Sequence, residues 1–286
     1  MELQSKLGIK EKLAQASKLP KSPKSSSRLS SVANSIRLLK AFTDDEYELG
    51  VSSLAKRLGL AKSTVHRLAS TLIKDDMLEQ DKETGKYRLG LALFELGARV
   101  RRKMNVFNEA QFALKELVEK TGETAHLTVL DHASVLFLYK VESRQAIRMK
   151  SVLGARVPAH SSADGKALLA YQSKEMVESI AVDGLAALTP RTIIDLGQLM
   201  ADLAQVRARG YALDDEETEI GLRAIAAPIR DHNGEVVAAI SVAGPVQRMT
   251  KKVVLSHAPK VIAAAEAISA RLGHSPRHAM RLQRFA

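Results

Sequence analysis

The stretch VSSLAKRLGLAKSTVHRLASTL, from Val51 to Leu72, predicts two short helices joined by a tight turn. Ala55 is small enough for the two helices to cross closely, and Gly59 can adopt the positive φ that the turn between them requires. Leu60 is expected to fill the angle between the helices. Apolar residues at helical spacing predict one shared core, formed by Leu54, Leu58, Val65 and Leu68. Together these positions match the spacing of a helix-turn-helix motif.

The second of these helices, from about Lys62 to Asp75, leaves hydrogen-bond donors and cations off its buried face. Such side chains suit contacts with bases and phosphates. The candidates for DNA contact are Lys62, Ser63, Thr64, His66, Arg67 and Ser70. A helix from Ser31 to Phe42 precedes the pair, and a hairpin from Glu79 to Leu89 follows it. On that hairpin, three basic residues could lie along a DNA backbone as a wing does: Lys82, Lys86 and Arg88.

Basic residues are concentrated in the first third of the chain. The 286 residues include 43 Lys and Arg against 32 Asp and Glu, which gives a net charge of +11. Residues 1–103 hold 21 basic and 12 acidic residues, whereas residues 104–286 hold 22 and 20. At roughly 150 residues per domain, this pattern predicts a nucleic-acid-binding domain followed by a domain with another task. Packed helices with a solvated polar face also occur in proteins that bind no DNA, but the spacing, hairpin and charge together favour DNA binding.

The composition excludes several classes of protein. Cysteine is absent, which excludes disulfide frameworks, thiolate zinc sites, iron–sulfur clusters and cysteine nucleophiles. The longest apolar run, from Val236 to Val246, is far shorter than the ~20 residues that a membrane-spanning helix needs. The first 30 residues carry no apolar segment of signal-peptide length. We therefore expect a soluble protein that stays in the cytoplasm. No Walker or dinucleotide-binding glycine motif is present, and no cofactor is expected.

The rest of the chain mixes helical and strand patterns. Leu91–Lys103 is predicted to be a connecting helix, and Thr124–Leu130 with Ser134–Val141 to be a hairpin. The other predicted helices are Val106–Lys120, Asp164–Ile180, Asp195–Arg209 and Thr250–Leu272, and the other predicted strands are Ile147–Val152, Ala224–Ile229 and Glu235–Ala243. The expected fold class is α+β, with an antiparallel sheet in the second domain.

Over about Ser31 to Leu272, the sequence resembles the IclR family of bacterial transcriptional regulators. Three segments carry the resemblance: the winged segment with STVHRL and GKYRLG, the run RVPAHSSADGKALLA from Arg156, and the run YALDDEETEIGLRAIAAPIRDHNGEVVAAISVAGP from Tyr211. The resemblance implies an N-terminal winged helix-turn-helix domain, a connecting helix and a C-terminal GAF-like α/β effector-binding domain. It also implies a homodimer or homotetramer in which Thr64 and Arg67 contact bases.

On this basis the chain divides into five predicted parts. They are a flexible basic arm over 1–30, a winged helix-turn-helix domain over 31–90, a linker helix over 91–104, an effector-binding domain over 105–273 and a basic tail over 274–286. The arm holds seven basic and two acidic residues, so it could follow phosphates electrostatically or be an inert extension.

A ligand site is expected where Gly165-Lys166-Ala167 opens a helix, because unpaired backbone N–H groups there suit a polar or anionic ligand. By resemblance, the effector pocket is lined by Met149, Val157, Ala163, Asp164, Asp214, Leu222, Ala224, Ser241 and Ala243. The effectors that the resemblance implies are organic acids, aromatic catabolites or sugar acids.

Two positions depart from the family pattern, which commonly has an apolar or small residue in place of Asp164 and often a Cys in place of Ala224. A carboxylate at 164 would repel an acidic effector, so a polyol or a cation is an alternative ligand. Asp164 could also be a plain helix cap.

Other chemistry is less well supported by the sequence. The run Asp214-Asp215-Glu216-Glu217 could hold a hard cation, but consecutive acids alternate in direction, and a solvated turn with one inward carboxylate fits better. His160, Ser161 and Asp164 include the residue types of a hydrolytic triad without the G-x-S-x-G motif. His126 is interpreted as a packed strand residue. No metal site and no catalytic site is predicted.

These features predict a sequence-specific DNA-binding transcriptional regulator, a repressor or an activator, that serves a catabolic pathway. Two winged helices of an oligomer would read a pseudo-palindromic operator, and a bound effector would act on them through the helix from Leu91 to Lys103. Two alternatives stay open. One is an enzyme whose GAF-like domain catalyses while the N-terminal domain anchors it to DNA. The other is a non-specific architectural nucleic-acid binder.

Overall fold

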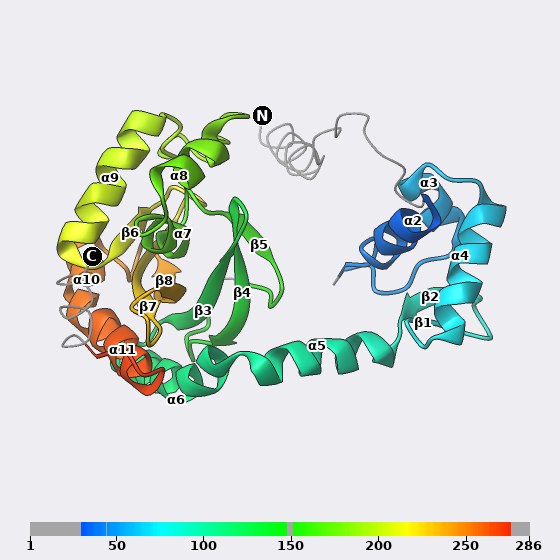
Figure 1. The fold of residues 1–286 in the computed structure, drawn as a ribbon, viewed down its shortest axis with the longest axis horizontal. Helices are drawn as coiled ribbons and strands as arrows, with labels where there is room; N and C mark the ends of the chain where they lie inside the picture. The colour runs from blue at the N-terminus through cyan, green and yellow to red at the C-terminus, as the bar shows by residue number, and fades with distance from the viewer. Residues whose placement is uncertain (1–29, 44, 148–150, 276–286) are drawn as a thin grey trace. The chain divides into compact units, whose positions relative to one another are not determined.

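A computed structural model describes residues 30–43, 45–147 and 151–275 (Figure 1). The chain divides into two compact units, Met1–Arg99 and Val100–Ala286. The arm predicted over 1–30 and the tail predicted over 274–286 lie almost entirely outside the described residues.

The described part of the N-terminal unit contains helices and one hairpin. They are α2 (Ser30–Leu39), α3 (Val51–Leu58), α4 (Lys62–Lys74), β1 (Leu78–Gln80) and β2 (Tyr87–Leu89). Gly59 ends α3 with a φ of 67°, and its N–H donates to the carbonyl of Ala55. A residue without a Cβ adopts this left-handed conformation without strain. The predicted helix-turn-helix and the hairpin after it are confirmed.

One hydrophobic core holds these elements together. Leu54 of α3 and Val65 of α4 are completely buried, as the spacing predicts. Tyr87 of β2 belongs to the same core and is 2% exposed. The backbones of Tyr87 and Leu49 also exchange two hydrogen bonds, each of 2.9 Å. The hairpin therefore packs on the helices through side chains and is joined by backbone hydrogen bonds to the segment that precedes α3.

Helix α5 (Leu91–Lys103) follows the hairpin, as predicted. None of its residues is buried, and the side chains of Leu91 and Phe94 are each 71% exposed. A helix of this length is marginally stable without packing against a partner.

The C-terminal unit is built on a six-stranded antiparallel sheet with the strand order β5-β4-β3-β8-β7-β6 (Figure 1). The strands are β3 (Thr124–Asp131), β4 (Ser134–Val141), β5 (Arg156–Pro158), β6 (Ala212–Asp215), β7 (Leu222–Arg230) and β8 (Val236–Pro245). β3 and β4 form the predicted hairpin, and β7 pairs with β8 across the Asn233-Gly234 turn. The predicted α+β class with an antiparallel sheet is confirmed.

Helices cover both faces of this sheet. α6 (Asn105–Thr121) and α11 (Ala258–Arg271) pack on one face, and α7 (Ala163–Leu169) with α9 (Leu196–Arg209) pack on the other (Figure 1). The alternation of side chains along β7 accounts for this arrangement, because successive strand residues point to opposite faces. Ile225 packs with α6 and α11, whereas Ala224 packs with α7 and α9.

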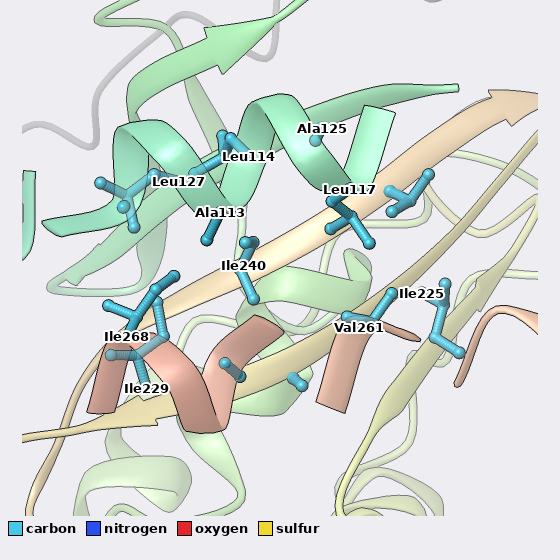
Figure 2. Close-up of a cluster of buried hydrophobic side chains, with 14 of the residues drawn as sticks. Ala113, Leu114, Leu117, Ala125, Leu127, Ile225, Ile229, Ile240, Val261 and Ile268 are labelled. Carbon is cyan, nitrogen blue, oxygen red and sulfur yellow. The ribbon is translucent and has the colours of Figure 1, made fainter. Parts of the chain in front are cut away.

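The core between the sheet and the α6–α11 pair consists of large aliphatic side chains. Figure 2 shows Leu114 and Leu117 of α6 with Val261 and Ile268 of α11 around the strand that carries Ile240. All five are at most 1% exposed. By contrast, the core on the opposite face includes many alanines.

Three predicted elements differ from the structure. The helix expected over 164–180 is two helices, α7 and α8 (Lys174–Ala181), because the Ser173 hydroxyl accepts a hydrogen bond from the N–H of Met176 and starts a new helix. The helix expected over 250–272 is α10 (Lys251–Ser256) and α11, with a proline in the first turn of the second. Of the strand expected over 147–152, the described residues 147, 151 and 152 lie in no strand, and residues 148–150 lie outside the described part of the chain. The short edge strands β5 and β6 were not predicted.

The segment Lys251–Arg271 is the one described stretch that is long and apolar enough to cross a membrane by length and composition. Its apolar side chains, including Val254 and Val261, pack into the core of the C-terminal unit. The segment therefore has the character of a core helix.

Candidate functional site

Helix α4 presents a polar surface around a buried apolar stripe. The stripe consists of Val65, Leu68 and Ala69. The residues predicted to contact DNA lie off this stripe: Lys62, Ser63, His66 and Arg67 are exposed, and Thr64 and Ser70 are half-buried. Within the described residues neither Lys62 nor Arg67 forms an ion pair, so both charges are available to an anion.

The hairpin places its three predicted basic residues differently. Lys82 and Lys86 are exposed at and beside the turn. The guanidinium of Arg88 lies 2.9 Å from Glu79, its cross-strand neighbour, and 3.6 Å from Glu48. The hydrogen bond with Glu79 raises the pKa of Arg88. Because these carboxylates offset its charge, Arg88 is less suited to phosphate than the two lysines.

A small cavity lies between α7 and the sheet of the C-terminal unit. Its volume is about 20 Å³, which is room for about one water molecule, so a larger ligand requires the surrounding side chains to move. Seven of the nine residues predicted for the effector pocket line this cavity: Val157, Ala163, Asp164, Asp214, Leu222, Ala224 and Ala243. Ser241 is buried on β8 without lining it, and Met149 lies outside the described residues.

The register of the sheet explains why residues far apart in the sequence meet here. Asp214 on β6 pairs with Ala224 on β7, which pairs with Ala243 on β8. Residues directly opposite each other on neighbouring strands point to the same face of a sheet. The row therefore places two small side chains beside the Asp214 carboxyl, and their size leaves space under α7.

Four further lining residues were missed from the sequence: His126, Phe137, Ser162 and Thr218. The ring of His126 packs edge-on against the ring of Phe137, with 5.1 Å between ring centroids. His126 is indeed a packed strand residue, but it also faces the cavity. The pairing of His126 with Ser241 on β8 puts it there, and that register cannot be read from either strand alone.

The imidazole of His126 is neutral and incompletely hydrogen-bonded. Its Nε2 lies 2.9 Å from the hydroxyl of Ser151. Its Nδ1 has no hydrogen-bond partner among the described residues. Burial, reinforced by the charge of Lys140, lowers the pKa of His126 to about 3. At neutral pH the ring is therefore uncharged, and it gives the cavity wall a nitrogen that can form a hydrogen bond.

Asp164 is a buried carboxyl and not the cap of α7. The cap is Ser162, whose hydroxyl accepts a hydrogen bond from the N–H of Gly165. The Asp164 carboxylate accepts a hydrogen bond of 2.9 Å from the hydroxyl of Thr128. Burial raises the pKa of Asp164 to about 6, and the neighbouring charge of Asp214 adds to this rise. The interpretation of Asp164 as a plain helix cap is therefore wrong.

Two acids of the run 214–217 point inward, where the sequence predicted one. Asp214 and Glu217 are 2% and 8% exposed. One oxygen of Asp214 accepts hydrogen bonds from the backbone N–H groups of Glu217 and Thr218, at 2.7 and 3.3 Å. Burial nevertheless raises the pKa of Asp214. The outer acids pair with arginines, for example Asp215 with Arg223.

The ammonium of Lys166 is buried within this acidic cluster. It lies 2.6 Å from Glu217 and 3.0 Å from Asp202, and Lys166 is 2% exposed. Burial still raises the pKa of Glu217 to about 7, although Lys166 opposes the rise. The sequence singled out Lys166 for opening a helix, whereas the structure makes it the counter-ion of two acids from other elements.

Gly165 allows α7 to lie against the preceding loop. A Cβ at this position would stand 2.1 Å from the carbonyl oxygen of Ala159, far inside van der Waals contact. No other residue type can approach that backbone so closely. The helix that carries Asp164 and Lys166 is positioned by this contact.

The described residues are not arranged as a hydrolytic triad or as a metal site. The imidazole Nε2 of His160 is 3.0 Å from the carbonyl of Ala186, and the hydroxyl of Ser161 donates to the carbonyl of Pro158. These contacts differ from those of a hydrolytic triad with Asp164. No group of three or more His, Asp or Glu side chains in the described chain could hold a metal ion.

Two family models match the chain. One is the IclR helix-turn-helix domain, over residues 31–82, and the other is the C-terminal domain of the bacterial transcriptional regulator IclR, over residues 98–270. The HTH-type transcriptional regulator KdgR of Escherichia coli is 37% identical over 248 residues, which cover 86% of this chain and 94% of the relative. The HTH-type transcriptional regulator BhcR of Paracoccus denitrificans is 40% identical over 230 residues, which cover 80% and 82%.

A solved structure is similar over the same span. It is that of an IclR homolog from Microbacterium hydrocarbonoxydans complexed with 4-hydroxybenzoate, with a TM-score of 0.76 and 30% identity. The match covers 86% of this chain and 100% of that one. The family and these relatives are transcriptional regulators and not enzymes.

Proposed function

Because this chain belongs to the IclR family of bacterial transcriptional regulators, we propose that α4 reads a specific operator whose occupancy depends on a small molecule bound under α7. The chain is a DNA-binding transcriptional regulator. What we propose beyond that is which side chains contact DNA, where the effector binds and how many copies act together. The observation that carries the proposal is the cavity, on which seven predicted effector residues converge.

The DNA contacts are assigned by exposure and charge. Thr64 and Arg67 on α4 are assigned to base edges, where an arginine can form two hydrogen bonds with guanine. The other polar residues of α4 and the wing lysines are assigned to phosphates, namely Lys62, Ser63, His66, Ser70, Lys82 and Lys86. Arg88 is assigned a minor contact because it is paired with acidic residues.

We assign the chain to a homodimer or homotetramer that binds a pseudo-palindromic operator. The exposed apolar side chains of α5 support self-association, because Leu91 and Phe94 are each 71% exposed and exposed apolar patches mark interaction surfaces. Residues 91–104 join the two units in sequence, and effector binding would act on DNA affinity through them. As a DNA-binding regulator, the protein is expected in the cytoplasm.

The DNA assignment is tested by substitutions on α4. Arg67→Ala should weaken binding to the operator by roughly 10- to 100-fold, equivalent to the ~1–3 kcal/mol of one base contact. Lys40→Ala removes an exposed cation from the end of α2 and serves as the matched control. Affinity is measured by gel shift with operator DNA and with a scrambled duplex. Equal affinity of the wild type for both duplexes would support the architectural binder instead.

The effector assignment is tested by filling the cavity. Ala224→Phe places a large ring where the cavity wall is now a methyl group, so it should abolish any effect of an effector on operator affinity. Operator affinity without effector should be unchanged. The effector is sought by a thermal-shift screen, since a ligand at 100 times its Kd adds ~2.7 kcal/mol of stability. An effector response that survives Ala224→Phe would place the site elsewhere.

A further inference from the structure

We infer that the effector presents hydroxyl or ammonium hydrogen-bond donors, and not a carboxylate, to the carboxyls of Asp164 and Asp214, which line the same cavity. This inference rests on the proposed function of the cavity as the effector site. It concerns the class of ligand that the cavity accepts. The resemblance implies an acidic effector, whereas the cavity wall of this chain carries two acidic residues.

Negative charge is in excess around the cavity. Asp164 and Asp214 both line it, and each is at most 5% exposed. They are close enough for the charge of Asp214 to raise the pKa of Asp164. Among the described residues that line the cavity, none is a lysine or an arginine. Within the described chain, an incoming carboxylate would therefore meet two acids and no cation on the cavity wall.

The nearest buried cation is already neutralised. The ammonium of Lys166 lies between Glu217 and Asp202, at 2.6 and 3.0 Å. Arg209 adds a second positive charge at 3.6 Å from Asp202. The charge of Lys166 also reaches Asp214, where it lowers the pKa against the effect of burial. Counted together, Lys166 and Arg209 face four acids, namely Glu217, Asp202 and the two cavity carboxyls, so negative charge stays in excess.

The other described residues of the cavity wall are uncharged, and His126 is one of the polar ones. His126 is 1% exposed, and its unpaired Nδ1 can donate to or accept from a hydroxyl, depending on the tautomer. The nearest cation to this ring is Lys140, whose ammonium already donates to the carbonyl of Ser151 at 2.5 Å and lies 2.7 Å from Glu142. Lys140 does not line the cavity.

These features suit a ligand rich in donors. Ionised carboxylates accept hydrogen bonds but do not donate them. Asp164 already accepts from Thr128, and one oxygen of Asp214 accepts from two backbone N–H groups. Any partner for their remaining acceptor sites must also donate. A polyol or an amine supplies such donors to Asp164 and Asp214, and a further hydroxyl can pair with His126. Alanines form part of the cavity wall. Because the cavity has room for about one water molecule, the surrounding side chains must move to admit the carbon chain of such a ligand. The inferred class therefore differs from 4-hydroxybenzoate, the carboxylate found with the Microbacterium relative.

The inference is tested by calorimetric titration of the full-length protein at pH 8 with matched probes. The probes are polyols of three to six carbons, the corresponding terminal amines and the corresponding terminal acids. At least one polyol or amine should have a Kd about tenfold or more below that of its matched acid, which corresponds to a difference in binding free energy of ~1.4 kcal/mol. Asp164→Asn and Asp214→Asn should each narrow that ratio by raising the affinity for the acid. Asp183→Asn, at an exposed position, should leave every affinity unchanged.

The two carboxamide variants also separate the two kinds of donor. An ammonium ligand should lose affinity in both, whereas a hydroxyl ligand should keep it, because the amide oxygen still accepts a hydrogen bond. The inference is overturned if an acid binds the wild type as tightly as its polyol and amine, or if no polyol or amine binds. Ala224→Phe distinguishes the two levels of failure. If an acid binds the wild type and Ala224→Phe abolishes that binding, the cavity is the effector site but accepts another class of ligand. If the acid still binds Ala224→Phe, the proposed site is wrong.

Discussion

Replacing the buried carboxyl of Asp164 by an amide should stabilise the C-terminal unit, and the gain should depend on pH. Burial raises the pKa of this carboxyl from 3.8 to about 6, so the folded state holds the proton more tightly than the unfolded state does. The ionised carboxylate is thus disfavoured in the fold. Stability is lost as the pH rises from the unfolded pKa through the folded one.

The size of the effect follows from the shift. About two pKa units at 1.36 kcal/mol each give a cost of roughly 3 kcal/mol at pH 8. The same linkage gives about half that cost at pH 5 and less than 1 kcal/mol at pH 4. Asp164→Asn keeps an oxygen that can accept from the hydroxyl of Thr128, now at 2.9 Å, and removes the charge. It should therefore recover most of this cost at pH 8.

Urea unfolding of the full-length protein, followed by circular dichroism at pH 5 and pH 8, measures this difference. The variant should be more stable than the wild type by roughly 3 kcal/mol at pH 8, with an unchanged m-value, and the gap should shrink at pH 5. Asp183→Asn, on the surface, should show no gap at either pH. A variant that is less stable at pH 8, or a gap that does not change with pH, would refute the assignment of burial as the dominant cause.

Three further substitutions test the packing around the two sites. Lys166→Met should destabilise the C-terminal unit by ~3–5 kcal/mol, because it leaves the buried Glu217 without its counter-ion, and adding Glu217→Gln should recover part of that loss in denaturant titrations. Gly165→Ala should lower the melting temperature of the same unit, since its Cβ would stand 2.1 Å from the carbonyl of Ala159; a variant as stable as the wild type in calorimetry would contradict the close approach. Gly59→Ala should destabilise the N-terminal unit by about 1 kcal/mol, because a residue with a Cβ is strained at a left-handed φ. A variant that loses its helix content over the same temperature range as the wild type would argue against this strain.

The sequence alone predicted the parts that depend on local interactions. The helix-turn-helix is set by residues within 22 positions of one another, because Ala55, Gly59 and the apolar stripe act within one pair of helices. The hairpin from Leu78 to Leu89 has a turn held by Asp81, whose carboxylate accepts hydrogen bonds from the backbone N–H groups of residues 83 and 84. Seven of the nine residues that the resemblance predicts for the effector pocket line one cavity.

The tertiary structure alone decided the chemistry of that cavity. His126 faces it only because β3 pairs with β8 in a register that sets this ring opposite Ser241. Lys166 becomes a buried cation because Glu217, 51 residues away, folds back onto it. Asp164 is buried because α7 packs on the sheet, and burial raises the pKa of its carboxyl. Burial and charge pairing arise between segments distant in the chain, so a pattern along the sequence can place a residue on a helix or strand but cannot determine its ionisation state.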